Sequence, residues 1–210
     1  MIVYVPEDIM DRLEKQLQKT PDMIPDVLRK TINSVAKYGR KATVERTREK
    51  YVLKKATKRI RDASEYESAR GKQFNATILI KGHPEPLISF EVRKNGKRVS
   101  AKAKVLQTSK LEKLTTVKDG ETLKAFVQTV KAKSKQGDIT HHVGVFRRMT
   151  EEEREESNSE KRNAIKQLYS TSIPQMVKND EVYPQIEKDI KAELHRTLEK
   201  HIAKVMEGMK

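Results

Sequence analysis

The sequence predicts an α+β fold in which long N-terminal and C-terminal amphipathic helices pack on a central antiparallel β-sheet. Three observations carry this prediction: a helical stripe of apolar residues over 24–42, another over 181–207, and alternating apolar residues between 74 and 148. The chain is expected to form a single domain over 1–210. Its expected parts are a helical segment over 1–63 that is basic from 37, an antiparallel sheet over 74–148, a mobile charged loop over 149–163, and a short strand plus the C-terminal helix over 164–210.

The N-terminal third is predicted to be helical. Residues 7–18 place three large apolar residues at helical spacing. Thr20 and Pro21 then suit the N-cap and the first position of a long helix. A further short helix is expected across 52–63. The apolar stripe of the long helix recurs at steps of three and four residues: Ile24, Val27, Leu28, Thr31, Val35, Tyr38 and Ala42.

The middle of the chain alternates apolar and polar residues, as a half-buried sheet does. A turn is expected over 82–86, and Asn95-Gly96 favours the positive φ angles of a two-residue hairpin turn. Residues 107–122 are polar and are predicted to form a mobile excursion. The predicted strands cover 74–81, 87–93, 98–105, 123–131 and 139–147.

Two adjacent histidines in "HHVGVFRR" (141–148) raise the question of a metal or catalytic site. Neighbouring residues of a strand point to opposite faces, so His141 and His142 cannot both bind one ion without distortion. The sequence contains no H-E-x-x-H spacing, no G-x-S-x-G turn and no cysteine. We therefore expect no catalytic residues, no bound metal and no cofactor.

The same segment is interpreted as a core strand. Val143, Val145 or the opposite-facing Phe146 is expected to pack inward. Gly144 would permit a close approach or a bulge, and both arginines would face outward.

Positive charge is the strongest compositional signal. The net charge is +15, and residues 37–61 hold 11 Lys/Arg against 2 Glu. Only Tyr38 and Tyr51 lie among these cations, so base stacking and sequence-specific reading of DNA are not expected. No apolar run approaches the ~20 residues of a membrane helix, so no membrane contact is expected. The cations form either a solvated face or a contact with the phosphates of a polyanion such as DNA: Lys37, Arg40, Lys41, Arg46, Arg48, Lys50, Lys54, Lys55, Lys58, Arg59 and Arg61.

Four segments, taken together and in this order, resemble the minor tail protein Z family of tailed bacteriophages and prophages, within the wider group of tail-completion proteins. They are "REKYVLKKATKRIRDA" (48–63), "ATILIKGHPEPLISFEV" (76–92), "HHVGVFRR" (141–148) and "NAIKQLYSTSIPQM" (163–176), which the C-terminal helix follows. Where the family has Gly-Pro after its Leu-Tyr, this chain has Ser170-Thr171, and Gln167 replaces a glutamate. The motif positions expected in the core are Leu87, Phe90, His142, Val145, Phe146, Leu168, Tyr169, Pro174 and Met176.

The resemblance implies a non-enzymatic component of the virion tail, which would be found in the host bacterial cytoplasm during assembly. It implies action late in tail assembly at the head-proximal end, as a homo-oligomeric ring, with six copies in a sixfold tail. The implied partners are other tail proteins, head–tail joining proteins and phage DNA contacted without sequence preference. Charge alone leaves a non-specific DNA-binding protein as the alternative. A metallohydrolase using His141 and His142 is a third hypothesis.

Overall fold

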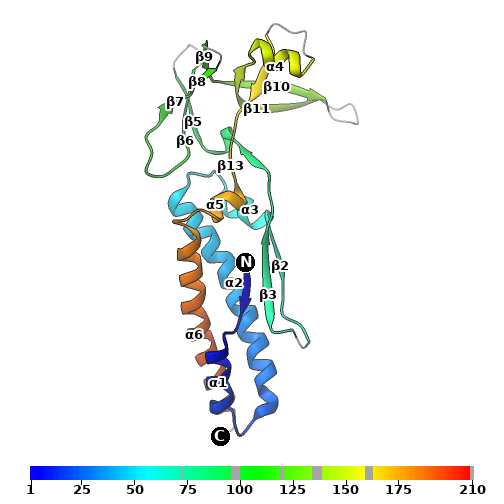
Figure 1. The fold of residues 1–210 in the computed structure, drawn as a ribbon, viewed down its shortest axis with the longest axis vertical. Helices are drawn as coiled ribbons and strands as arrows, with labels where there is room; N and C mark the ends of the chain where they lie inside the picture. The colour runs from blue at the N-terminus through cyan, green and yellow to red at the C-terminus, as the bar shows by residue number, and fades with distance from the viewer. Residues whose placement is uncertain (72, 96–99, 119–120, 134–138, 159–162, 209–210) are drawn as a thin grey trace. The chain divides into compact units, whose positions relative to one another are not determined.

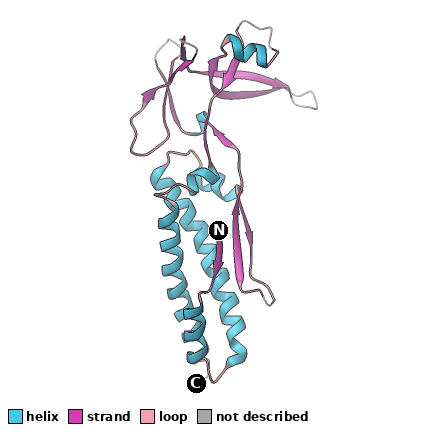
Figure 2. Ribbon diagram, in the orientation of Figure 1, coloured by secondary structure: helices cyan, strands magenta, loops and turns pink. Residues whose placement is uncertain are grey.

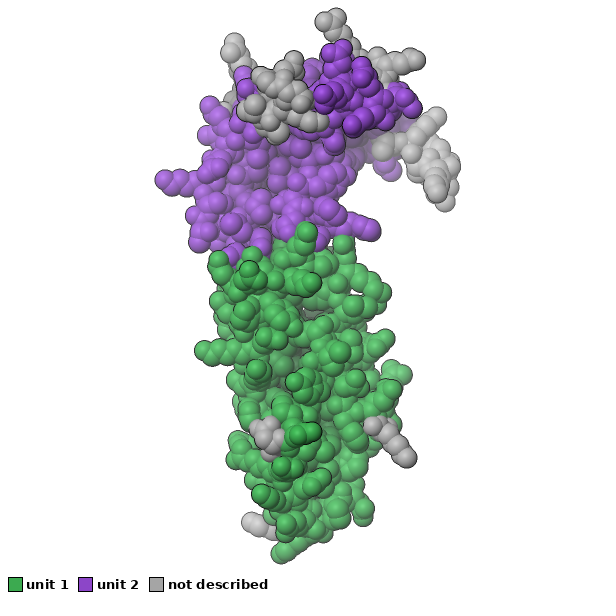
Figure 3. Space-filling model, in the orientation of Figure 1, with its two compact units in different colours: residues 1–49, 55–82, 173–210 green, residues 50–54, 83–172 purple. Residues whose placement is uncertain are grey.

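The computed structural model describes residues 1–71, 73–95, 100–118, 121–133, 139–158 and 163–208. The chain forms two compact units, shown in Figure 3: unit 1 contains 1–49, 55–82 and 173–210, and unit 2 contains 50–54 and 83–172. The α+β class is confirmed, because long helices occur together with antiparallel strands (Figures 1 and 2). The strands form several small sheets rather than one central sheet.

Unit 1 holds both long helices and one small sheet. Its three-stranded sheet has the order β1-β3-β2, and both strand pairs are antiparallel. The elements are β1 (Ile2–Tyr4), α1 (Glu7–Gln16), the 3-10 turn η1 (Pro21–Met23), α2 (Ile24–Lys50), α3 (Ala56–Asp62), β2 (Ser64–Glu67), β3 (Asn75–Ile80), α5 (Ile173–Val177) and α6 (Tyr183–Glu207).

Helices α2 and α6 lie side by side and run antiparallel (Figure 1). Thr31 Oγ1 lies 2.9 Å from His201 Nδ1, and towards the other end of α2 Arg46 Nε donates to Asp189 at 2.7 Å. Gly39 marks a close approach: a Cβ there would lie 3.1 Å from the Cδ1 of Ile190. A residue without a side chain therefore lets the two helices pack tightly at this point.

The core of unit 1 is aliphatic and draws on three helices and the sheet. Because β-strand side chains alternate between faces, Val3, Ala76 and Ile78 point inward and are buried. The core cluster includes Ile9, Leu13 and Leu17 of α1, Val27, Leu28, Ile32 and Val35 of α2, and Leu194, Leu198 and Ile202 of α6.

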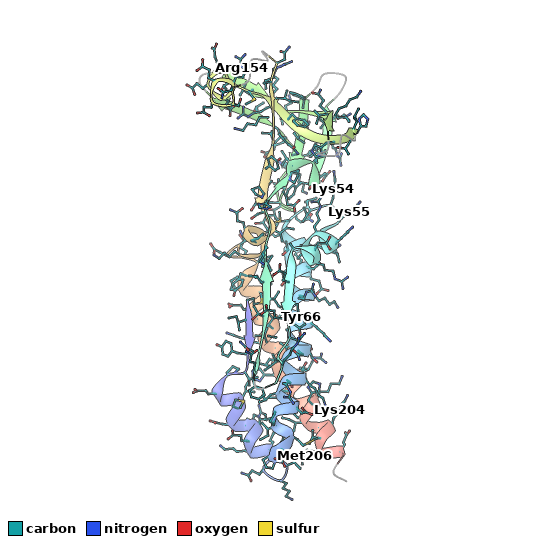
Figure 4. The ribbon with its side chains drawn as sticks, turned by 90° about the vertical axis from the view of Figure 1, so that its right-hand side faces the viewer. Lys54, Lys55, Tyr66, Arg154, Lys204 and Met206 are labelled. Carbon is teal, nitrogen blue, oxygen red and sulfur yellow. The ribbon has the colours of Figure 1, made fainter. Side chains whose placement is uncertain are left out.

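Asn33 of α2 ties the segment after β2 to the helix. Its Oδ1 accepts from the backbone N–H of Ala69 at 2.8 Å and from the Tyr66 hydroxyl at 3.0 Å. Its Nδ2 donates to the carbonyl of Ala69 at 3.2 Å. Tyr66 is labelled in Figure 4, and its burial raises the pKa of its phenol. The amide of Asn33 thus satisfies both the backbone N–H and the carbonyl of Ala69, which lies outside any strand.

Unit 2 is built from short antiparallel strands. Its sheets have the orders β10-β11-β12, β5-β6-β7, β8-β9 and β13-β4. The elements are β4 (Pro84–Pro86), the 3-10 turn η2 (Leu87–Ser89), β5 (Glu91–Asn95), β6 (Ser100–Lys104), β7 (Glu112–Lys113), β8 (Thr115–Lys118), β9 (Glu121–Lys124), β10 (Phe126–Lys133), β11 (Ile139–Arg148), α4 (Glu151–Glu156), β12 (Ile165–Gln167) and β13 (Tyr169–Ser172).

Several local expectations differ from the structure in unit 2. Asn95 ends β5 and pairs with Ser100. The expected turn at Asn95-Gly96 falls on residues 96–99, which lie outside the described part. The expected turn over 82–86 includes strand β4, while the expected strand at 87–93 begins as the 3-10 turn η2. The polar segment 107–122 contributes strands β7 and β8. Strand β4 forms because it pairs with the distant strand β13, so a long-range pairing overrides the local turn pattern there.

Strand β11 contains the segment with the two histidines. Val145 and Phe146 are buried, whereas Val143 is exposed. Gly144 permits the expected close approach: a Cβ there would lie 2.8 Å from Cε2 and Cζ of the Phe146 ring. The two arginines differ, because Arg148 is exposed whereas Arg147 is buried rather than facing outward.

Arg147 is buried because it has a buried partner. Its Nη1 and Nη2 donate to the two carboxylate oxygens of Glu153, each at 2.6 Å. Lys166 Nζ donates to the same carboxylate at 3.0 Å. Thr150 and Glu153 also form a reciprocal capping box at the start of α4. The segment 149–163, expected to be a mobile loop or the tip of a helix, therefore includes a short capped helix, and residues 159–162 lie outside the described part.

Candidate functional site

A groove between α2 and α3 in unit 1 is lined mostly by charged side chains. Its volume is about 520 Å³. All of its lining residues lie within 37–61, the stretch that holds 11 Lys/Arg against 2 Glu. Eight residues line it: Lys37, Arg40, Lys41, Val44, Glu45, Arg48, Thr57 and Arg61. Five cations therefore face one carboxylate, and we name this surface the α2–α3 groove.

Helical spacing explains why these residues meet. Positions 37, 40, 41, 44, 45 and 48 follow steps of three and four residues, so they form one face of α2. Thr57 and Arg61 are four residues apart and share a face of α3. The opposite face of α2 is buried in the core of unit 1. The groove thus follows from one amphipathic helix beside a second, shorter one.

Arg40 is the most enclosed cation of the groove. Its Nη2 donates to the carbonyl of Ser64 at 3.3 Å. Its Nε is buried and has no hydrogen-bond acceptor among the described residues. An unpaired buried donor costs about 1–3 kcal/mol, so this N–H is a reason to expect a further acceptor at the site.

The structure separates the eleven cations that the sequence offered for polyanion contact. Five of them line the α2–α3 groove: Lys37, Arg40, Lys41, Arg48 and Arg61. Lys41 also lies 3.7 Å from Glu45. The remaining six do not line it: Arg46, Lys50, Lys54, Lys55, Lys58 and Arg59.

Some of these six have other roles. Lys50 and Lys54 belong to unit 2, where Lys54 Nζ donates to the carbonyl of Ile88 at 3.0 Å. Lys55, labelled in Figure 4, precedes α3 with a left-handed backbone at φ 54°. A non-glycine residue seldom adopts this conformation, so Lys55 serves as the bend into α3.

Arg46 is bound to carboxylates on both sides. It donates to both oxygens of Asp189 at 2.7 and 3.0 Å, and its Nη1 donates to Glu49. The hydrogen bond to Asp189, followed by the one to Glu49, raises the pKa of the Arg46 guanidinium. The same contact lowers the pKa of Asp189. Arg46 therefore holds α2 to α6 and is not a candidate for phosphate contact.

The nine motif positions also separate. Buried ones are Leu87, Phe90, Val145, Phe146 and Met176. Leu168 and Pro174 are half-buried, whereas His142 and Tyr169 are exposed rather than part of the core. His142 Nε2 lies 3.0 Å from the Nε2 of Gln167, whose Oε1 accepts weakly from the Tyr169 hydroxyl at 3.4 Å. These three side chains form a polar row at the surface of unit 2.

Two further observations bear on other kinds of site. Within the described ranges no three His, Asp or Glu side chains are grouped closely enough to hold a metal ion.

A larger cavity of about 690 Å³ in unit 2 is lined by residues that include Phe126, Gln128 and Arg148, and Arg148 donates to Asn163 at 2.7 Å. No carboxylate or histidine is among its described lining residues, so it offers no acid–base pair.

Three residues of the groove were not predicted from the sequence. Val44, Glu45 and Thr57 carry no positive charge, so a search for cations passes over them. Val44 and Glu45 lie three and four residues after Lys41, on the same face of α2. Their helical spacing from the cations could therefore have identified them. Thr57 required knowledge that α3 lies against α2.

None of the helices in the described ranges is long and apolar enough to span a membrane. Comparisons of the chain with protein-family models, with curated proteins and with solved structures find no match.

Proposed function

We propose that this chain is a structural component of a bacteriophage or prophage tail, of the minor tail protein Z type. In this proposal it acts at the head-proximal end of the tail, in tail completion, as a ring of identical copies around the DNA channel. A head-to-tail contact whose rotation closes makes such a ring, and a sixfold tail would require six copies.

One observation carries the proposal: four segments of the chain resemble those of the family in the same order. The last two of them, 141–148 and 163–176, are the most specific. The burial of Val145, Phe146 and Met176 supports a framework role for these segments. In a protein of this kind, motif residues would preserve a shape rather than carry a reaction.

Surface features agree with a protein that works beside other chains. Strand β1 lies at the edge of its sheet, and its Ile2 and Tyr4 side chains are exposed. Leu79 of the neighbouring strand β3 is exposed as well. Three large apolar side chains on one sheet face are the kind of surface that partner proteins cover.

Deletion of the gene from the phage or lysogen that encodes it tests the proposal. We expect induced cultures to contain heads and tails that fail to join, or tails of abnormal length, in negatively stained electron micrographs. Expression of the chain from a plasmid should restore infectious particles, and gold-labelled antibody should mark the head-proximal end of the tail. Normal titres of infectious particles without the gene would reject the proposal.

A further inference from the structure

The cations of the α2–α3 groove lie along a line. Helix α2 rises about 1.5 Å per residue, so Lys37 and Arg48 are separated by roughly 16 Å along one face. Arg40 and Lys41 lie between them, and Arg61 adds a charge from α3. One small anion cannot contact charges spread over this length, whereas a chain of phosphates can.

Several of these cations are not committed to a partner within the protein. Lys37 and Arg61 have no ion-pair partner in the part of the chain that the structure describes. A guanidinium has five N–H donors, and for Arg40 the only acceptor among described residues is the Ser64 carbonyl. The groove therefore presents several donors at once, in addition to its net positive charge.

The lining residues also limit how a ligand can be recognised. No aromatic side chain lines the groove among the described residues, so bases have nothing to stack on. Contacts from Lys and Arg to phosphates position a nucleic acid but carry no sequence information. Recognition by this surface would thus depend on charge and spacing.

We infer that the α2–α3 groove binds the phosphodiester backbone of a nucleic acid, without regard to base sequence. This inference goes beyond the proposed function and stands on the residues of the groove, whether or not the chain belongs to a tail. A nucleic acid fits better than an acidic protein segment because its charge is denser. Both strands of duplex DNA together carry one charge per ~1.7 Å of the axis, and each strand alone carries one per ~3.4 Å at every nucleotide. An extended peptide matches a single strand, at one charge per ~3.3 Å, only where every residue is acidic.

The salt dependence of binding tests the inference. Lys41 pairs with Glu45, so we count three groove cations as phosphate contacts: Lys37, Arg40 and Arg61. Three contacts predict that log K falls with log salt at a slope of about −2.7. Binding of the purified chain to a fluorescent 30-base-pair duplex of arbitrary sequence, measured by anisotropy, should therefore weaken ~40-fold between 50 and 200 mM KCl.

Two double variants that each remove two positive charges distinguish the effect of the groove cations on binding from the effect of the net charge. Lys37→Gln with Arg61→Gln removes two of these three cations, which should reduce the slope to about a third and leave a ~3-fold weakening over the same salt range. Lys15→Gln with Lys191→Gln removes two exposed cations of unit 1 outside the groove. This control should keep the slope of the unaltered chain. Circular dichroism spectra of both variants should match it.

Three results would overturn the inference. The first is a groove variant whose slope equals that of the unaltered chain, and the second is a control that loses as much as the groove variant. The third is poly-glutamate competing as well as DNA at equal charge concentration, which would indicate an acidic protein partner. The binding assay uses only the purified chain, so its failure leaves the tail proposal standing. Failure of the gene deletion test equally leaves the groove unaffected.

Discussion

Removing the Glu153 carboxylate should be among the most damaging single changes in unit 2. The side chains of Arg147 and Glu153 are only 9% and 5% exposed, and two hydrogen bonds of 2.6 Å join them. Glu153→Ala leaves the Arg147 guanidinium buried without its partner, which costs about 3–5 kcal/mol. Loss of the capping box with Thr150 adds about 1 kcal/mol. This is a large share of the ~5–15 kcal/mol that stabilises a typical domain.

Urea unfolding followed by circular dichroism measures the change, and hydrogen exchange of peptides from 139–172 locates it. Glu152→Ala is the matched control, because Glu152 lies in the same helix and is exposed. We expect the control to stay within about 0.5 kcal/mol of the unaltered protein. The double change Arg147→Met with Glu153→Leu should recover much of the loss, because apolar residues replace both buried charges.

The pH dependence gives a second readout. The hydrogen bond from Arg147, the largest cause, lowers the pKa of Glu153 below its ordinary value of 4.5. The stabilising effect is therefore present above about pH 4.5 and is lost as the pH falls towards the lowered value. The unaltered protein and Glu153→Ala should converge in stability on acidification. If Glu153→Ala is no less stable than Glu152→Ala at pH 7, the reasoning about the buried pair is refuted.

Three other predictions concern β11 and α6. Gly144→Ala should lower the free energy of unfolding by about 1–3 kcal/mol in thermal unfolding, because the new Cβ would lie 2.8 Å from the Phe146 ring. An unchanged melting temperature would show that the ring moves freely. Phe146→Ala should cost about 3–5 kcal/mol in urea unfolding, since the ring is buried; a loss below about 1 kcal/mol would place it outside the core. Burial, followed by nearby lysines, lowers the pKa of His201, so stability should be retained above pH 6.5 and decline below it. His201→Gln should flatten this decline in melting temperatures measured from pH 8 to 5, and an equal decline in the variant would contradict the assignment.

The long helices were predictable because their signal is local. An apolar stripe at helical spacing predicted α6 from 181, and it begins at Tyr183. Helix α2 continues to Lys50, eight residues beyond the last apolar position of the predicted stripe, because Thr43 and Thr47 extend its buried face. Their hydroxyls donate to the carbonyls of Gly39 and Thr43 at 2.8 and 2.7 Å, which satisfies them inside the core. The predicted stripe included Thr31 but stopped at Ala42, before Thr43 and Thr47.

The sheets were harder to predict because their pairing is long-range. Alternation correctly placed a strand near 75–80, but its neighbours β1 and β2 come from the first 67 residues. For the candidate site, the composition showed how many cations the segment 37–61 contains. It could not show which of them line the groove and which bind carboxylates elsewhere. Helical geometry would have placed Arg46 on a different face of α2 from Arg40. Only the structure shows that Asp189 binds Arg46. The Thr150-x-x-Glu153 signature of a capped helix was readable, but the burial of Arg147 was not.

The division of unit 1 along the chain has a consequence for its synthesis. Helix α2 ends at Lys50, and α6, which covers part of its apolar stripe, begins at Tyr183. A ribosome adding about 5–20 residues per second needs roughly 6–26 s to make the intervening ~130 residues. During that interval the strands of unit 2 are synthesised, and α2 lacks its antiparallel partner. Until α6 is made, the nascent chain therefore exposes the part of the aliphatic stripe that α6 covers, and premature termination before α6 would leave that part uncovered.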